Sequence, residues 1–262
     1  MPRIRLPAAV AVAVAIAVTV PSVAQGATLH QVGRTPHRVL LQDESGETNL
    51  VSVEGSQAVL IHDTTAPIAL AGVPTCMPLD ANTVRCSAVR RIELDLGVGP
   101  DVAHIATPLP VALDGGPGND RYVAGATGAP SRVDFAGGIG LDVANYGFAT
   151  AGVDVSVDVE GGDGRPGDDD RIRGDVETVF GSRFADVLGG GARTVQLAGL
   201  DGDDDIAGGA GEELLSGGPG NDRIDARDGA ADRVDCGGQA LDRAAVDIDA
   251  EASIAGCAQV TP

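Results

Sequence analysis

Residues 199–225 decide the fold: Gly199-Leu-Asp-Gly-Asp-Asp-Asp-Ile-Ala207 is followed by Gly208-Gly-Ala-Gly-Glu-Glu-Leu-Leu-Ser216 and Gly217-Gly-Pro-Gly-Asn-Asp-Arg-Ile-Asp225. A period of nine fits neither a helix nor an isolated strand, so it is interpreted as a structural repeat. Each unit then supplies one tight turn and one short strand with a single inward apolar side chain. Two units complete a coil, which places equivalent residues 18 positions apart. The sequence therefore predicts an all-β solenoid. The apolar series comprises Leu188, Leu197, Ile206, Leu215 and Ile224.

The turns between these apolar residues have the composition of a hard-cation site. Glycine is needed where a turn passes through positive φ, which a Cβ makes costly. Such turns direct backbone carbonyls into the space between coils, and the aspartate at the sixth position of the unit adds a carboxylate. Calcium accepts six to eight oxygen ligands in flexible geometry. We therefore expect Ca²⁺ between the turns, with a solvated turn that holds no ion as the alternative.

This pattern resembles the hemolysin-type (RTX) calcium-binding repeats. The best copies are Gly217–Asp225 and Gly115–Val123, and residues 176–188 resemble the phrase that often precedes such arrays. The resemblance implies a right-handed parallel β-roll with calcium between its turns. The metal ligands that it predicts are Gly115, Gly116, Gly118, Asp120, Asp142, Asp186, Gly199, Asp201, Gly202, Asp204, Gly217, Gly218, Gly220, Asp222 and Asp242.

The two sides of the predicted roll are unequal. One side carries Asp186, Asp204, Asp222 and, after two extra residues, Asp242, whereas the other carries Val195, Glu213 and Asp232 at the same station. Valine cannot ligate a cation, and glutamate is one methylene longer than the aspartate it replaces. We therefore expect calcium mainly in the Asp186/Asp204/Asp222 column, and little effect of Glu213→Ala on binding.

The remainder of the chain divides by composition. Glycine turns of irregular spacing predict solenoid rungs over 91–180, ahead of the strict array at 181–246. The acidic loop 163–170 is either a further calcium site or a solvated excursion. Alternating apolar runs predict a small β-meander cap with a disulfide loop over 27–90, because the open end of a solenoid needs cover. A C-terminal cap and tail are expected over 247–262.

The first 26 residues have the features of a secretory signal peptide. Arg3 and Arg5 precede an apolar run from Ala8 to Val20 that is short for a membrane span and is followed by small residues. We expect a bacterial protein that is secreted or held at the cell surface. In that setting the four cysteines favour disulfides within the local pairs Cys76/Cys86 and Cys236/Cys257, with zinc binding as the rival.

Charge and motifs limit the partners and activities. The net charge of −20 disfavours nucleic acid and anionic membranes as partners. Because His-Glu-x-x-His, Gly-x-Ser-x-Gly and Walker motifs are missing from the sequence, we expect no enzyme. Which protein or glycan would bind is left open. The alternative is a lyase or epimerase of polysaccharides that uses a groove on a β-helix, assembled from Asp168, Asp169, Asp170, Arg171 and Arg173, although sugar-stacking aromatics are scarce.

Overall fold

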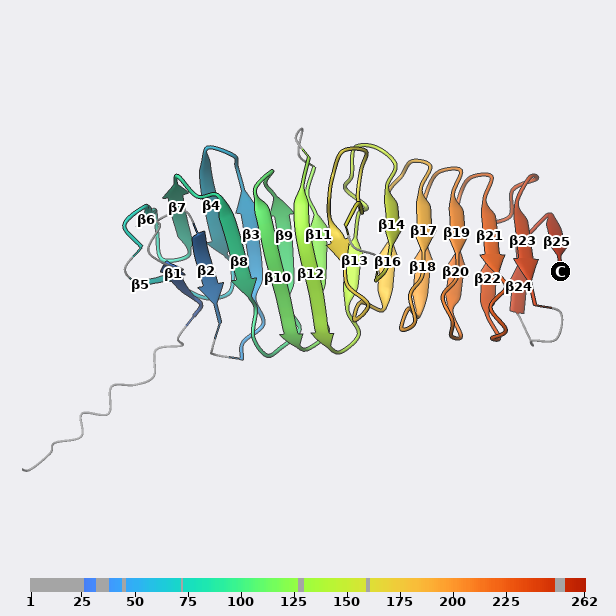
Figure 1. The fold of residues 1–262 in the computed structure, drawn as a ribbon, viewed down its shortest axis with the longest axis horizontal. Coiled ribbons are helices and arrows are strands. Elements are labelled where there is room, and N and C mark those ends of the chain that lie inside the picture. The colour runs from blue at the N-terminus through green and yellow to red at the C-terminus, as the bar shows by residue number, and fades with distance from the viewer. Residues whose placement is uncertain are drawn as a thin grey trace, which may run out of the picture.

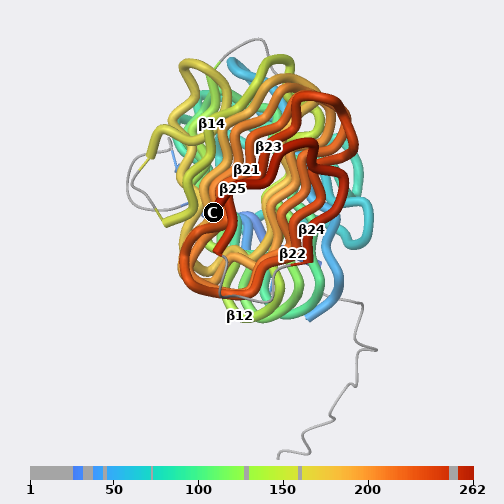
Figure 2. Tube along the Cα trace, turned by 90° about the vertical axis from the view of Figure 1, so that its right-hand side faces the viewer, coloured from blue at the N-terminus to red at the C-terminus, as the bar shows by residue number. Residues whose placement is uncertain are grey.

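A computed structural model describes residues 26–31, 38–43, 46–71, 73–126, 130–158, 161–247 and 253–262. The predicted signal peptide lies outside these residues, except for Gly26. Throughout the described residues the regular elements are strands, stacked along one long axis (Figure 1). The end-on view shows the chain coiling around that axis (Figure 2). Among the described residues, the structure contains no helix that is long and apolar enough to cross a membrane. The predicted all-β parallel solenoid is confirmed.

The longest sheet, sheet B, runs the whole length of the solenoid. Its strand order is β24-β22-β20-β18-β16-β13-β11-β9-β3-β4-β7-β6, and every pair from β24 to β3 is parallel. Its strands are β3 (Leu50–Glu54), β4 (Ala58–Asp63), β6 (Cys76–Pro78), β7 (Thr83–Ser87), β9 (Val102–Ala106), β11 (Arg121–Ala124), β13 (Val143–Asn145), β16 (Thr178–Phe180), β18 (Gln196–Ala198), β20 (Leu214–Ser216), β22 (Arg233–Asp235) and β24 (Ser253–Ala255).

Two shorter sheets succeed each other on the opposite side of the coil. Sheet A serves the N-terminal half and sheet C the C-terminal half. Sheet A contains β1 (Thr28–Gln31), β2 (Arg38–Gln42), β5 (Ala69–Ala71), β8 (Arg91–Asp95), β10 (Pro110–Pro117), β12 (Arg132–Ile139) and β15 (Arg171–Ile172). Sheet C contains β14 (Asp154–Ser156), β17 (Val187–Gly189), β19 (Asp205–Ala207), β21 (Arg223–Ala226), β23 (Arg243–Val246) and β25 (Gln259–Thr261).

The chain alternates between the two sides, so the solenoid has two turn edges. We call the turns that lead from sheet A or C into sheet B edge 1, and those that lead from sheet B into sheet A or C edge 2. In the strict array the register between neighbouring coils is 18 residues, as the pairs Val187↔Asp205 and Asp205↔Arg223 show. This register is the one that the nine-residue period predicts.

Inward side chains form a narrow core whose width changes along the axis. The three-residue strands from β16 to β20 each bury one large residue, such as Leu188, Ile206 or Leu215. Longer strands in the N-terminal half bury two, as Val133 and Phe135 do in β12. Full burial of a large apolar side chain contributes about 1.5–3 kcal/mol, so each coil adds a modest increment of stability.

A buried polar network lies where sheet A gives way to sheet C. Asp170 is fully buried, and its Oδ2 accepts hydrogen bonds from the hydroxyls of Tyr122 (3.2 Å) and Tyr146 (3.3 Å). Its Oδ1 accepts the backbone N–H of Val133 at 2.8 Å. Burial raises the pKa of Asp170 to about 6. The acidic loop 163–170 thus contributes a carboxylate that ties β11 and β12 together.

Both ends of the described chain depart from the simple coil. In the N-terminal segment β4 and β7 add antiparallel strands to sheet B, while β2 and β3 already pair in parallel with β8 and β9. Within residues 247–262, where we expect a cap, β24 and β25 add further parallel strands.

The two predicted disulfides, Cys76–Cys86 and Cys236–Cys257, are present. They point to an extracellular or otherwise oxidising location.

Candidate metal centre

The predicted ligands separate onto the two edges of the solenoid. Gly115, Gly116, Gly118, Asp120 and Asp142 lie on edge 1, next to the unpredicted Asp101. The others lie on edge 2: Asp186, Gly199, Asp201, Gly202, Asp204, Gly217, Gly218, Gly220, Asp222 and Asp242. The glycine–aspartate turn therefore changes edge between Asp142 and Asp186, at the coil where sheet C begins. Asp201 is exposed, whereas the ladder aspartates described next are buried.

Each buried aspartate is joined to the preceding coil by its Oδ1 atom. On edge 2 the backbone N–H of Asp186 donates to Asp204 Oδ1, and that of Asp204 donates to Asp222 Oδ1, both at 2.9 Å. On edge 1 the N–H of Asp101 donates to Asp120 Oδ1 at 2.8 Å, and that of Asp120 donates to Asp142 Oδ1 at 2.7 Å. We call these rows the edge-1 and edge-2 ladders. Each ladder therefore links successive coils through one oxygen, Oδ1, of each carboxylate.

The second oxygen of the ladder carboxylates has a different environment. Within the two ladders, the Oδ2 atoms of five described aspartates are buried and make no hydrogen bond: Asp101, Asp120, Asp142, Asp204 and Asp222. These five side chains belong to residues that are at most 2% exposed. A buried charged oxygen without a partner is costly, so it calls for a counter-charge or a proton.

Bare glycines face four of these Oδ2 atoms, those of Asp120, Asp142, Asp204 and Asp222. A Cβ on Gly115 would lie 2.5 Å from Asp120 Oδ2 and 2.6 Å from the carbonyl oxygen of Gly137 in the next coil. A Cβ on Gly199 or Gly217 would likewise overlap the carboxylate five residues on. A carboxylate oxygen and a carbonyl oxygen thus approach the same point, and only glycine leaves room for them. This donor set fits a hard cation such as Ca²⁺.

Burial also changes the titration of the ladder. Loss of solvent, together with the carboxylates of adjacent coils, raises the pKa of Asp120 and Asp204 to about 7. The same causes raise the pKa of Asp101, Asp142 and Asp222 to about 6. Hydrogen bonds from the ladder N–H groups act in the opposite direction and do not outweigh burial. The ladders therefore hold carboxylates that retain protons well above their ordinary range.

At the ends of the ladders, hydrogen-bond donors of the protein bind the carboxylate oxygens that are left open further along. Both oxygens of Asp186 are taken by Ser182, whose N–H and Oγ donate at 2.6 and 2.7 Å, and Asp242 Oδ2 accepts the N–H of Gln239 at 2.6 Å. At the start of edge 1, Asn49 Nδ2 donates to Asp43 Oδ2 at 3.1 Å. The same nitrogen donates to the carbonyl of Leu96 at 3.0 Å. Asp186 and Asp242 are thus placed in the column but already hydrogen-bonded through both oxygens.

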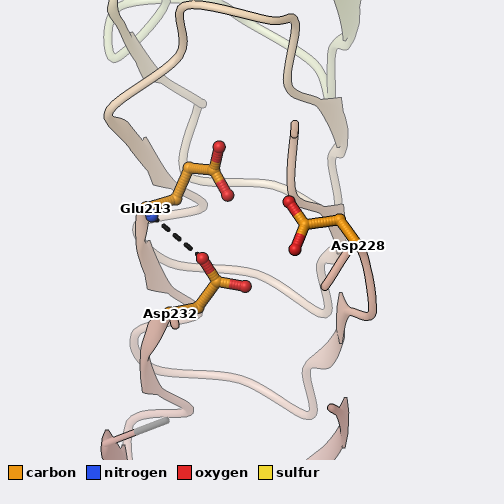
Figure 3. Close-up of side chains that lie close together, drawn as sticks. All are labelled: Glu213, Asp228 and Asp232. Carbon is orange, nitrogen blue, oxygen red and sulfur yellow. Dashed lines mark hydrogen bonds between the residues drawn. The ribbon is translucent and has the colours of Figure 1, made fainter. Parts of the chain in front are cut away.

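Further along edge 1 a second acidic cluster appears. Glu213, Asp228 and Asp232 each offer a carboxylate oxygen within 4.8 Å of the others, an arrangement that could hold a metal ion (Figure 3). Glu213 and Asp232 occupy the aspartate station of consecutive coils, and Asp228 comes from the turn after β21. This cluster lies on the side for which the sequence analysis expects little binding, and Asp228 is a residue that it missed.

The structure also separates the residues of the alternative groove enzyme. Asp170 points into the interior toward the two tyrosines, and Asp168 is paired with Arg165. Arg173 instead forms an ion pair with Asp134 at 2.8 Å. Asp163, in the same loop, accepts the N–H groups of Ser156 and Ile172. The loop carboxylates and Arg173 are therefore engaged with different partners.

Comparison with known proteins leaves the family open. Neither the protein-family models nor the curated proteins compared with this sequence contain a match.

Proposed function

We propose that this protein is a calcium-binding β-roll of the RTX type, in which Ca²⁺ is held by the ladder carboxylates and the carbonyls of the glycine turns. The observation that carries the proposal is that the two oxygens of each ladder carboxylate have different surroundings. Oδ1 accepts a hydrogen bond from the backbone of the preceding coil, while Oδ2 of Asp120, Asp142, Asp204 and Asp222 is buried next to a bare glycine. Asp101 shares the hydrogen-bond pattern, because its Oδ1 accepts the N–H of Asn49 and its Oδ2 is buried without a hydrogen bond.

A bound cation would supply stability that the thin core lacks. Ordering each residue costs about 1–2 kcal/mol of backbone entropy, and this chain has 38 glycines, which lose the most. A site at ten times its dissociation constant adds about 1.4 kcal/mol to folding. Several sites in series would therefore stiffen the coil. The role that we propose is therefore structural or one of surface interaction, outside the cytoplasm and without enzymatic activity.

Exchange of Asp204 and Asp222 for asparagine tests the proposal. Asparagine keeps an oxygen for the ladder hydrogen bond but replaces the Oδ2 charge with an N–H donor. We expect the double variant D204N/D222N to lose calcium sites in isothermal titration calorimetry of the oxidised protein without its signal peptide. D205N is the matched control, because Asp205 is exposed and its carboxylate pairs with Arg223. Unchanged calcium uptake by D204N/D222N would contradict the proposal.

A gain of binding is expected from Asn49→Asp. The Asn49 amide nitrogen lies among oxygens of Asp43, Leu96 and Asp101, where it takes the place of a cation. A carboxylate there would crowd oxygens together until a cation separates them. We expect N49D to bind one additional calcium ion and to be less stable than the parent protein in chelator. Native mass spectrometry counts the ions, and an unaltered count would show that Asn49 does not stand in for a cation.

A further inference from the structure

The three carboxylates of Glu213, Asp228 and Asp232 come together from two coils and a turn. The backbone N–H of Glu213 donates to Asp232 Oδ1 at 2.9 Å, so these two residues continue the ladder pattern on edge 1. Asp228 approaches from the side, and its Oδ1 accepts the N–H of Ala230 at 2.7 Å. Figure 3 shows the carboxylates of Glu213 and Asp232 turned toward that of Asp228.

Two buried oxygens are directed into this cluster. Glu213 is 3% exposed and Asp232 is 1% exposed. Within the described part of the chain, neither Glu213 Oε2 nor Asp232 Oδ2 has a hydrogen-bond partner. The arginine next to Asp228 does not neutralise the cluster, because Arg227 is bound to Asp225 through two hydrogen bonds of 2.6 and 2.8 Å. The cluster therefore gathers negative charge with an unmet demand for a positive partner.

An open hollow gives access to the cluster from solvent. It has a volume of about 390 Å³ and is lined by Ala207, Gly208, Gly209, Asp225, Arg227 and Asp228. The two glycines form its wall beside Glu213: a Cβ on Gly208 would lie 3.2 Å from Glu213 Oε2. The exposed Asp228 carboxylate therefore belongs both to the lining of the hollow and to the cluster with the two buried carboxylates.

We propose that Glu213, Asp228 and Asp232 form a separate divalent-cation site of a different kind from the ladder sites. Its ligands are three side-chain carboxylates, one of them exposed, with water from the hollow completing the coordination. Carboxylates and water suit Ca²⁺ and Mn²⁺. The site does not depend on ions in the ladders. It fastens the turn 227–232 onto the preceding coil and exchanges its ion directly with solvent.

Mn²⁺ alone is the probe, because the electron paramagnetic resonance signal of free Mn²⁺ reports how much of the ion remains unbound. The full oxidised chain is titrated as the parent, D228N, E213Q and D205N. In D228N and E213Q an amide oxygen can still accept the N–H of Ala230 or Gly211, so the fold is retained. We expect each cluster variant to weaken one Mn²⁺ site by about tenfold or more, since even outer-shell changes have effects of that size. D205N should match the parent.

The outcome separates this site from the ladders. D204N/D222N should keep the Mn²⁺ site that D228N loses. If D228N and E213Q bind Mn²⁺ as the parent does, the cluster is not a cation site, whatever the ladders bind. If D204N/D222N and D228N abolish the same ion, the cluster is not separate. If D204N/D222N leaves calcium uptake unchanged while D228N and E213Q lose the Mn²⁺ site, the ladder proposal fails and the cluster site stands.

Discussion

Alanine at position 218 is expected to lower the free energy of unfolding by about 4 kcal/mol. Gly218 has φ of +105°, and its Cβ would overlap the carbonyl oxygen of Leu200 in the preceding coil. Backbone strain contributes about 1–3 kcal/mol. Forcing the coils apart adds about 1–3 kcal/mol more, as overpacking does elsewhere. Urea unfolding followed by circular dichroism in saturating calcium gives the difference between parent and variant.

Gly238→Ala is the matched control, one coil further along edge 2. Gly238 has φ of +95°, but among the described residues nothing lies within 4 Å of the position that its Cβ would take. In this variant only the left-handed conformation is unfavourable, so we expect the free energy of unfolding to decrease by about 1–2 kcal/mol. Equal losses from G218A and G238A would mean that the close approach of successive coils is not what requires glycine.

The second large effect is expected from pH and calcium together. The folded-state pKa of Asp120 and Asp204 is about 7, against an ordinary value of 3.8. A carboxyl with a raised folded-state pKa binds its proton more tightly when the protein is folded. Its contribution to stability is therefore fully present below about pH 4 and is lost as the pH rises through about 7. In chelator the temperature of the unfolding midpoint should therefore decrease as the pH is raised from 5 to 8.

Calcium should reverse this dependence, because the cation replaces the protons on the same oxygens. The rise in thermal midpoint on adding calcium is expected to be larger at pH 8 than at pH 5, and the apparent calcium affinity should drop as the pH falls through 7 to 6. D204N/D222N removes two of the titrating groups and should show a shallower slope in chelator. A chelated protein that is more stable at pH 8 than at pH 5 would contradict the assignment.

The repeat itself carried most of the fold prediction. Because each unit has one apolar residue and one glycine turn, the nine-residue period alone predicts the 18-residue register that pairs Asp205 with Arg223. The edge-2 ladder aspartates Asp204 and Asp222 followed from the same period. Local spacing and an oxidising setting similarly predicted both disulfides. These features depend on residues that are close in sequence or on an unbroken repeat, so they can be predicted from one amino-acid sequence.

What the sequence analysis missed depends on irregular coils. The glycine turn changes edge between Asp142 and Asp186, because an excursion between β14 and β15 is inserted into one coil. Asp228 reaches Glu213 through a turn that is one residue longer than the repeat. Asp170 contacts Tyr122 across 48 residues of chain. None of these contacts has a periodic signal, since each is created by a departure from the period.

Crystals grown in calcium test the central claim most directly, through an anomalous difference map collected at long wavelength. The account predicts peaks beside the Oδ2 atoms of Asp120, Asp142, Asp204 and Asp222, next to the glycines that face them. The hydrogen-bonded carboxylates of Asp186 and Asp242 should contribute less. Peaks confined to exposed carboxylates such as Asp205, or a map without peaks along either ladder, would show that the ladders are a scaffold and not a calcium column.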